Sequence, residues 1–88
     1  MASHAAGTVT IANHASQYVF GEYNVEDSSS ASALSRGNYV EIVGNGTASN
    51  AQSNARALDW SGNEYLNGYL YVGCNANSTS GTRIPHDI

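Results

Sequence analysis

The sequence predicts an all-β fold, and three observations lead to this prediction. Short runs rich in β-branched and aromatic residues recur along the chain, as at residues 17–21 and 38–43. Turn-forming residues separate these runs, since 36 of the 88 residues are Ser, Asn, Gly or Thr. No stretch shows the apolar period of an amphipathic helix. Short strands separated by frequent turns are typical of all-β chains.

The composition predicts a chain that does not form its core alone. Only 15 of the 88 residues are Val, Ile, Leu or Phe. The net charge of −4 and the 11% of charged residues nevertheless argue against a disordered acidic tail. The length allows one small domain, and Cys74 is the only cysteine, so the chain cannot form an internal disulfide. Because small domains without disulfides often depend on oligomerisation, we expect association with other copies.

The charge and hydropathy patterns exclude two kinds of partner. The chain has no lysine and only three arginines, so it cannot build the dense basic face that nucleic-acid binding requires. No apolar run approaches the roughly 20 residues that span a bilayer, so membrane insertion is not expected. The N-terminus also lacks a basic start followed by an apolar stretch, so we expect no self-directed export.

The first segment is expected to contain two strands. Val9 and Ile11 alternate with small or polar residues, which predicts a strand over residues 8–12. A second strand is expected at residues 17–21, where aromatic and β-branched residues adjoin.

The middle of the chain is expected to hold a loop and the clearest strand. Residues 27–37 are polar and small, which predicts an exposed loop. Residues 38–43 follow as a strand, with Val40 and Ile42 on one face and with Tyr39, Glu41 and Val43 on the other. An Asn-Gly pair at residues 45–46 then predicts a tight turn, because both residue types tolerate positive φ angles.

The last part is expected to end in a hairpin. Residues 48–57 are predicted to be irregular, because their apolar positions hold only alanine, and residues 58–60 to form a short strand. Residues 64–66 and 69–72 flank an Asn-Gly pair, which is the strongest short-range hairpin signal. Leucine and valine would share the covered side of this hairpin, and tyrosines the other side.

The tyrosines give the candidate ligand-binding site. Aromatic faces with nearby amides and hydroxyls suit sugar binding, but the same side chains also serve as packing between strands or subunits, which we favour. Trp60 belongs to the same aromatic set. The candidate ligand-binding residues are the tyrosines of the predicted hairpin: Tyr65, Tyr69 and Tyr71.

No catalytic or metal-binding motif is visible, and we expect neither enzymatic activity nor a cofactor. Asp59 and Glu64 form a carboxylate pair, but across a turn they are expected to be solvated hairpin ends. The pair His-Ala occurs at His4 and again at His14, which indicates about one turn of a short-period solenoid. In a symmetric oligomer these histidines would form rings able to bind an anion or a metal. We favour the alternative that each ring caps a turn through a hydrogen bond.

Taken in order, several segments resemble phage tail fibres and trimeric adhesin heads. Ser-His-Ala-Ala-Gly-Thr at residues 3–8 is similar to the Ser-His-Ala-Glu-Gly repeat of adhesin heads, which are left-handed β-rolls, with Ala6 in place of Glu. Val-Phe-Gly-Glu-Tyr-Asn at residues 19–24 resembles the segment that follows those repeats in many phage tail fibres. The runs at residues 39–47 and 52–63 resemble the continuation of that fibre family, although position 52 is Gln where the family usually has Arg.

This resemblance implies a homotrimeric fibre segment in which each chain completes its core against the other two. We expect a short β-roll or β-helix turn followed by antiparallel hairpins, in an intertwined homotrimer. Within one structural unit, residues 1–26 would be the head-repeat-like segment, residues 27–37 a polar loop and residues 38–88 a β-hairpin fibre module.

The implied function is a structural module of a phage tail fibre, assembled in the host cytoplasm and located in the virion. It would contact a host surface glycan or receptor through its loops and tyrosines. Two alternatives remain open, a carbohydrate-binding module that uses exposed tyrosines and the head of a bacterial trimeric surface adhesin.

Overall fold

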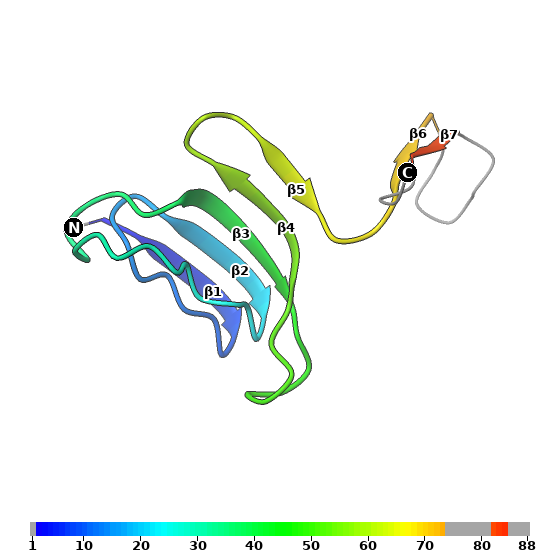
Figure 1. Cartoon of the computed structure of the whole chain (residues 1–88). Helices are drawn as coiled ribbons and strands as arrows, with labels where there is room; N and C mark the ends of the chain where they lie inside the picture. The colour runs from blue at the N-terminus through cyan, green and yellow to red at the C-terminus, as the bar shows by residue number, and fades with distance from the viewer. Residues whose placement is uncertain (1, 74–81, 85–88) are drawn as a thin grey trace.

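The computed structural model describes residues 2–73 and 82–84, and these residues form an all-β fold, as predicted (Figure 1). Cys74 lies outside the described residues, as does the greater part of the chain beyond it. The described residues contain seven strands and no helix: β1 (His4–Thr8), β2 (Tyr18–Glu22), β3 (Tyr39–Asn45), β4 (Asn54–Asp59), β5 (Glu64–Leu66), β6 (Leu70–Val72) and β7 (Thr82–Ile84).

The first five strands form one mixed sheet in the order β1-β2-β3-β4-β5. β1, β2 and β3 pair in parallel, whereas β3, β4 and β5 pair antiparallel. β6 and β7 form a separate antiparallel hairpin, which Figure 1 shows well away from the sheet. Within the described residues no sheet closes or curls up, so the β-roll expected from the resemblance is not shown here.

The parallel strands are joined without helices. Both long connections, residues 9–17 and 23–38, run over the same face of the sheet (Figure 1). Burial along strand β2 reflects this arrangement. Val19 is completely buried under the connections, while its neighbour Tyr18, on the opposite face, is 48% exposed. One face of the sheet is therefore covered by loops, and we call this the inner face. The other is the outer face.

A column of glycines runs across the three parallel strands. Gly7 pairs with Gly21, and Gly21 pairs with Gly44. A Cβ atom on Gly7 would overlap the carbonyl oxygen of Gly21, and a Cβ on Gly21 would overlap that of Gly44. The close approach of these backbones therefore requires glycine in this row.

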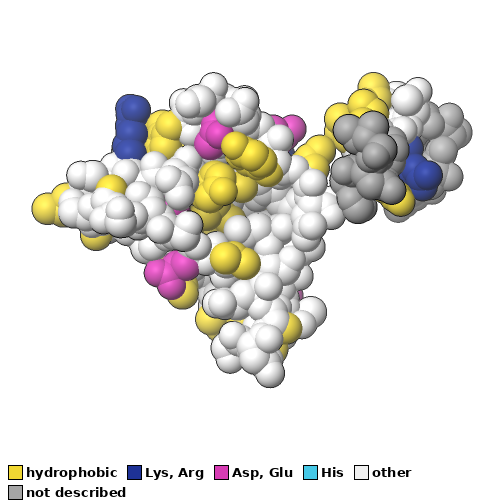
Figure 2. Space-filling view, in the orientation of Figure 1, with side chains coloured by type: hydrophobic (Ala, Val, Ile, Leu, Met, Phe, Trp, Pro, Cys, Tyr) yellow, Lys and Arg dark blue, Asp and Glu magenta, His cyan; other side chains and the backbone are white. Residues whose placement is uncertain are grey.

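The apolar core on the inner face is very small. Val19, Ile42 and Ala57 are its only buried hydrophobic members in the described part of the chain, with Ala12 and Tyr39 packed against them. Polar side chains make up the rest of the buried layer. On the surface seen in Figure 2, hydrophobic side chains appear only in small patches among other side chains and backbone.

The buried polar layer is held together by hydrogen bonds centred on Asp27. Its Oδ2 accepts hydrogen bonds from the Gln17 amide (2.9 Å) and from the backbone N–H groups of Asn38 (2.8 Å) and Tyr39 (2.9 Å). Its Oδ1 accepts a fourth from the Ser29 N–H at 2.9 Å. Residues 27–37 form a loop as predicted, but Asp27 itself is buried rather than exposed, because its carboxylate bonds the connection to the start of β3.

Asparagine side chains join other loop segments in the manner of strand pairing. The buried Asn24 accepts a hydrogen bond from the Ile11 N–H at 2.8 Å and donates one to the Ile11 carbonyl at 3.2 Å. Asn54 makes the same pair of bonds to Val25, at 2.7 and 3.3 Å. These side chains satisfy backbone groups that no neighbouring strand reaches.

The first predicted strand is shifted. The structure places it at His4–Thr8 rather than at residues 8–12. Val9 has a positive φ of 49° and lies beyond the strand end. The pairing of Gly7 with Gly21 determines where this strand lies. The alternation of apolar and polar residues, on which the prediction rested, does not.

Two further predictions fail around β3. A β-bulge between Tyr39 and Glu41 shifts the alternation, so that Tyr39 packs with the Ile42 side of the sheet. The Asn45-Gly46 pair is not the turn, because the Asn45 N–H still donates to the Ser53 carbonyl at 2.9 Å. The chain instead reverses beyond it, where an isolated bridge joins residues 48 and 51. The segment predicted to be irregular then enters β4 at residue 54.

The predicted hairpin around Asn67-Gly68 is also wrong. Strand β5 pairs with β4, and β6 pairs with β7. The Asn67 N–H donates to the Ala55 carbonyl at 3.0 Å, so the chain continues alongside β4 instead of reversing. Gly68 lacks the positive φ that a two-residue hairpin turn of type I′ requires. The turn at residues 61–63, by contrast, joins β4 to β5 as predicted.

The outer face of the sheet carries the side chains in register with Tyr18 and with Phe20, and neither connection of the described sheet runs over it (Figure 1). Its aromatic members lie over β1 and β2, where Tyr18 stacks on His4 with ring centroids 4.5 Å apart and meets Phe20 edge-on at 5.6 Å. Leu58 and Leu66 lie on the same face at β4 and β5. Ion pairs lie on the same face toward β3, β4 and β5. There the Arg56 guanidinium bonds the Glu41 carboxylate, and Arg56 Nε lies 3.7 Å from Glu64 Oε2. Among residues 2–73 and 82–84, no helical segment has the length and hydropathy of a membrane span.

Candidate functional site

The structure separates the three candidate tyrosines into two groups. Tyr65 lies on β5 of the main sheet, whereas Tyr69 and Tyr71 belong to the separate hairpin region. The rings of Tyr69 and Tyr71 meet edge-on with centroids 6.5 Å apart, and the Arg83 guanidinium lies 4.2 Å from the centre of the Tyr69 ring. Tyr65 instead meets Tyr39, which is 6.0 Å away at an interplanar angle of 86°. The three predicted residues therefore do not form one platform.

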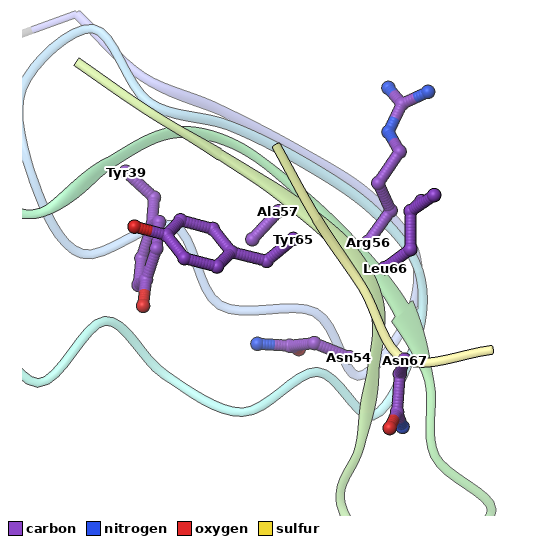
Figure 3. A pocket seen from close by; sticks show the side chains of 7 residues that line it. All are labelled: Tyr39, Asn54, Arg56, Ala57, Tyr65, Leu66 and Asn67. Atoms are coloured by element: carbon purple, nitrogen blue, oxygen red, sulfur yellow. The ribbon is translucent and has the colours of Figure 1, made fainter. Parts of the chain in front are cut away.

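Tyr39 and Tyr65 line an open hollow of about 300 Å³ at the β4–β5 end of the inner face (Figure 3). Ala57 forms its floor between the two rings, and the amides of Asn54 and Asn67 lie at its lower side. Figure 3 shows that Arg56 and Leu66, which also border it, point to the opposite side of the strands. The hollow is therefore aromatic and amide-lined, with no cation directed into it from these residues.

A second hollow of about 380 Å³ adjoins the same tyrosine pair. It is also lined by Asp59 at the end of β4, by Trp60 and Ser61 of the turn that follows, and by residues 37–38 of the connection before β3. Because Tyr39 and Tyr65 line both hollows, they form a corner with a recess on each side. We call Tyr39, Trp60 and Tyr65 the aromatic corner.

Asp59 organises this corner. Its Oδ1 accepts hydrogen bonds from the backbone N–H groups of Ser61 (3.0 Å) and Asn63 (2.8 Å). Its Oδ2 accepts the Tyr65 hydroxyl at 2.7 Å and the Asn63 amide at 3.1 Å. A carboxylate has about four lone-pair positions, so this one is fully used in fixing the turn and the tyrosine.

These hydrogen bonds shift two pKa values in opposite directions. The Tyr65 hydroxyl, followed by the Asn63 groups, stabilises the carboxylate and holds the pKa of Asp59 below its ordinary value of 3.8. The same hydrogen bond favours the neutral phenol and raises the pKa of Tyr65 above its ordinary value of 10.0. Both pKa shifts arise because a hydrogen bond that forms with only one protonation state favours that state. Asp59 therefore stays charged at neutral pH, and Tyr65 stays neutral.

Trp60 completes the corner and is covered from outside by Arg36. The Arg36 guanidinium carbon lies 4.1 Å from the centre of the Trp60 ring, which is the geometry of a cation–π contact. This contact holds residues 28–37, a loop otherwise largely exposed, against the β4–β5 turn.

Several polar side chains around the corner are free to bind. Within the part of the chain that the structure describes, the side chains of Asn38, Ser61 and Asn67 make no hydrogen bond, although each lines one of the two hollows. Asn54 differs, because its amide is already bonded to Val25. The aromatic corner thus combines fixed rings with free amide and hydroxyl groups.

The two histidines expected in equivalent positions occupy different environments. His4 lies exposed on β1 and stacks on Tyr18. His14 is buried, and its Nδ1 lies 3.3 Å from the Ser32 carbonyl. His14 thus holds a loop through a ring hydrogen bond, as the favoured prediction has it for both histidines, whereas the His4 ring stacks on Tyr18 instead. Among the described residues no cluster of three or more His, Cys, Asp or Glu side chains could hold a metal ion, and His86 lies outside these residues.

Asp59 and Glu64 stand on either side of the β4–β5 turn, as predicted for hairpin ends. Asp59 is committed to the turn and to Tyr65, and Glu64 faces Arg56 on the outer side. Sequence reasoning missed Tyr39 and Asn38 as members of the site. Tyr39 reaches it only through the bulge in β3, and no local pattern signals a bulge.

No family model matches the chain, and comparisons with curated proteins and with solved structures yield no match either.

Proposed function

We propose that this chain is a structural module of a phage tail fibre, or of a related surface fibre such as a bacterial trimeric adhesin head, and that it works as a homotrimer. In the phage setting it is assembled in the host cytoplasm and acts in the virion. The order of the segments that resemble fibre proteins supports membership of this family. The small apolar core of the sheet supports assembly from several copies of the chain. Loops and aromatic side chains repeated three times would contact the host surface, with avidity gained from simultaneous contacts.

One observation carries this proposal. In the described part of the chain the only buried hydrophobic side chains are Val19, Ile42 and Ala57. A single small core of this kind supplies little of the burial that a domain of this length needs. The hydrogen-bonded polar layer covers the inner face but contributes less, since each net hydrogen bond is worth about 1 kcal/mol. Stability must then come from burial between copies of the chain.

The outer face is the surface proposed to be buried between copies. Phe20 lies there, in one register row with Ala6 and Val43, and Tyr18 lies in the next row beside His4. Tyr18 is 48% exposed in the single chain. Phe20 and Val43 are half-buried, so together with Tyr18 they leave apolar surface open on this face, as interaction surfaces do.

The three parallel strands are proposed to be a short turn of a β-roll. Consecutive strands pair in parallel without helices, and Gly7, Gly21 and Gly44 repeat in register. Such stacking of small strands is how solenoid-type folds build length. The β1 edge consists of exposed residues, which are small except for His4, and would continue this stack.

Substitution on the outer face tests the assembly. Phe20→Ser places a hydroxyl in the proposed interface without touching the buried Val19, so the native mass and the unfolding midpoint should both fall at a given protein concentration. Leu34→Ser is the matched control, because Leu34 is 76% exposed in the loop before β3. Size-exclusion chromatography with light scattering measures both. Equal native masses for Phe20→Ser and Leu34→Ser would contradict the proposed interface.

A further inference from the structure

The aromatic corner has the properties of a small-ligand site that none of the comparisons assigns. Its two hollows, of about 300 and 380 Å³, reach the size of small-molecule sites. They share Tyr39 and Tyr65, whose rings stand at 86° to each other. Two perpendicular rings present one flat face and one edge to anything that enters the recess.

The corner is rigid before any ligand arrives. The Tyr65 hydroxyl is fixed by Asp59 at 2.7 Å, and Asp59 is fixed in turn by three hydrogen bonds from the β4–β5 turn. Tyr65 is nevertheless 49% exposed, so its ring face stays available to solvent. A preorganised aromatic ring loses little conformational entropy on binding.

The free polar groups select the class of ligand. Asn38, Ser61 and Asn67 offer amides and a hydroxyl that have no hydrogen-bond partner within the described residues. Each can both donate and accept, as the hydroxyl groups of a sugar also do. The one charged group inside the second hollow is the Asp59 carboxylate, which repels an anion.

We propose that the aromatic corner binds neutral pyranose units of a glycan, with the ring face of Tyr65 against the apolar face of a sugar. Asn38 and Ser61 would bond the hydroxyl groups of a sugar in one hollow, and Asn67 those of a sugar in the other. This inference deepens the receptor-contacting role in the proposed function, but the site uses residues of one chain only. It also replaces the predicted trio, because Tyr69 and Tyr71 lie in the other aromatic group.

The direct test is a titration of the ¹⁵N-labelled full chain with the neutral methyl pyranosides of glucose, galactose, mannose and N-acetylglucosamine. At least one of them should shift the amide signals of residues 38 and 61, which border one hollow, or that of residue 67, which borders the other. The methyl glycoside of glucuronic acid is the anionic counterpart, and it should bind more weakly than the glucoside. Absence of shifts with all four neutral probes, or tighter binding of the anionic one, would overturn the inference.

Variants assign the binding to the corner. Tyr65→Ala removes the stacking face and should weaken binding by about tenfold. Tyr65→Phe keeps the ring and loses the bond to Asp59, so it should bind more tightly than Tyr65→Ala. If Tyr65→Ala alters the fold, Asn67→Ala provides the second test, because the Asn67 side chain has no partner in the described structure.

Tyr71→Ala distinguishes the corner from the separate hairpin. Binding that is lost in Tyr71→Ala and retained in Tyr65→Ala would contradict the inference. The native mass is measured on the same samples, which keeps the two proposals apart. A trimer that binds no neutral sugar removes this inference alone, and a monomer that binds one through Tyr65 removes only the proposed assembly.

Discussion

Gly7 and Gly21 lie directly opposite each other in the parallel pair β1–β2, and both have positive φ angles, 110° and 100°. A side chain on Gly7 would overlap the backbone of Gly21, and Gly21 stands in the same relationship to Gly44. The three strands thus approach each other more closely at this row than residues with side chains permit. The glycine column sets the register of the parallel half of the sheet.

Gly21→Ala should therefore destabilise the protein strongly. The substitution meets both an unfavourable φ and the Gly44 carbonyl, so we expect a loss of about 2–4 kcal/mol in the free energy of unfolding. Gly68→Ala is the control, because a Cβ atom at Gly68 would meet nothing within 4 Å and the φ of this residue is not positive. It should change stability by less than about 0.5 kcal/mol. Urea unfolding at one protein concentration compares the two, and equal midpoints would argue against the column.

Asp27→Asn tests the buried polar layer. The amide would place a donor against the N–H groups of Asn38 and Tyr39 or the Gln17 amide, which all donate to the carboxylate. We expect a loss of about 2–4 kcal/mol. Glu26→Gln is the neighbouring control, since Glu26 is exposed and accepts one hydrogen bond, from Asn13 at 3.1 Å. Thermal unfolding followed by circular dichroism measures both, and a wild-type midpoint for Asp27→Asn would disprove the role given to this carboxylate.

The pair of Asp59 and Tyr65 predicts a pH dependence at the acid end. The folded-state pKa of Asp59 is lowered, chiefly by the Tyr65 hydroxyl. Its contribution to stability is therefore present above the unfolded-state pKa and is lost as the pH falls through the folded-state value, in the region below about pH 4. Tyr65→Phe should move the Asp59 pKa upward toward its ordinary value. Carbon-detected NMR titration of the carboxyl group measures this, and an unchanged pKa in Tyr65→Phe would show that the hydroxyl is not the cause.

The strands that sequence patterns predicted well are those that bury an apolar row. β2 and β3 were expected because β-branched and aromatic residues alternate there, and Val19 and Ile42 are buried in the structure. β1 was misplaced because its five residues are all exposed and include no large aliphatic side chain, so its own sequence carries no strand pattern. The strand exists because Gly7 fits against Gly21, which is a tertiary relationship.

The polar half of the core could not be predicted for a similar reason. Gln17, Asn24 and Asp27 are polar residues at strand ends or in loops, where solvent exposure is the usual expectation. Their burial depends on partners far along the chain, such as Tyr39 for Gln17 and Ile11 for Asn24. Tyr65 was identified from sequence as a candidate ligand residue. Its partner Tyr39 was not, because the bulge that turns Tyr39 inward has no local signature.

The most direct test of the central claim is the native mass of the full chain by sedimentation equilibrium at micromolar concentration. A chain of 9.2 kDa that buries only three apolar side chains within its described part should be found as a homotrimer of about 28 kDa, three times the chain mass. A stable, cooperatively folded species of 9.2 kDa at the same concentration would contradict the account.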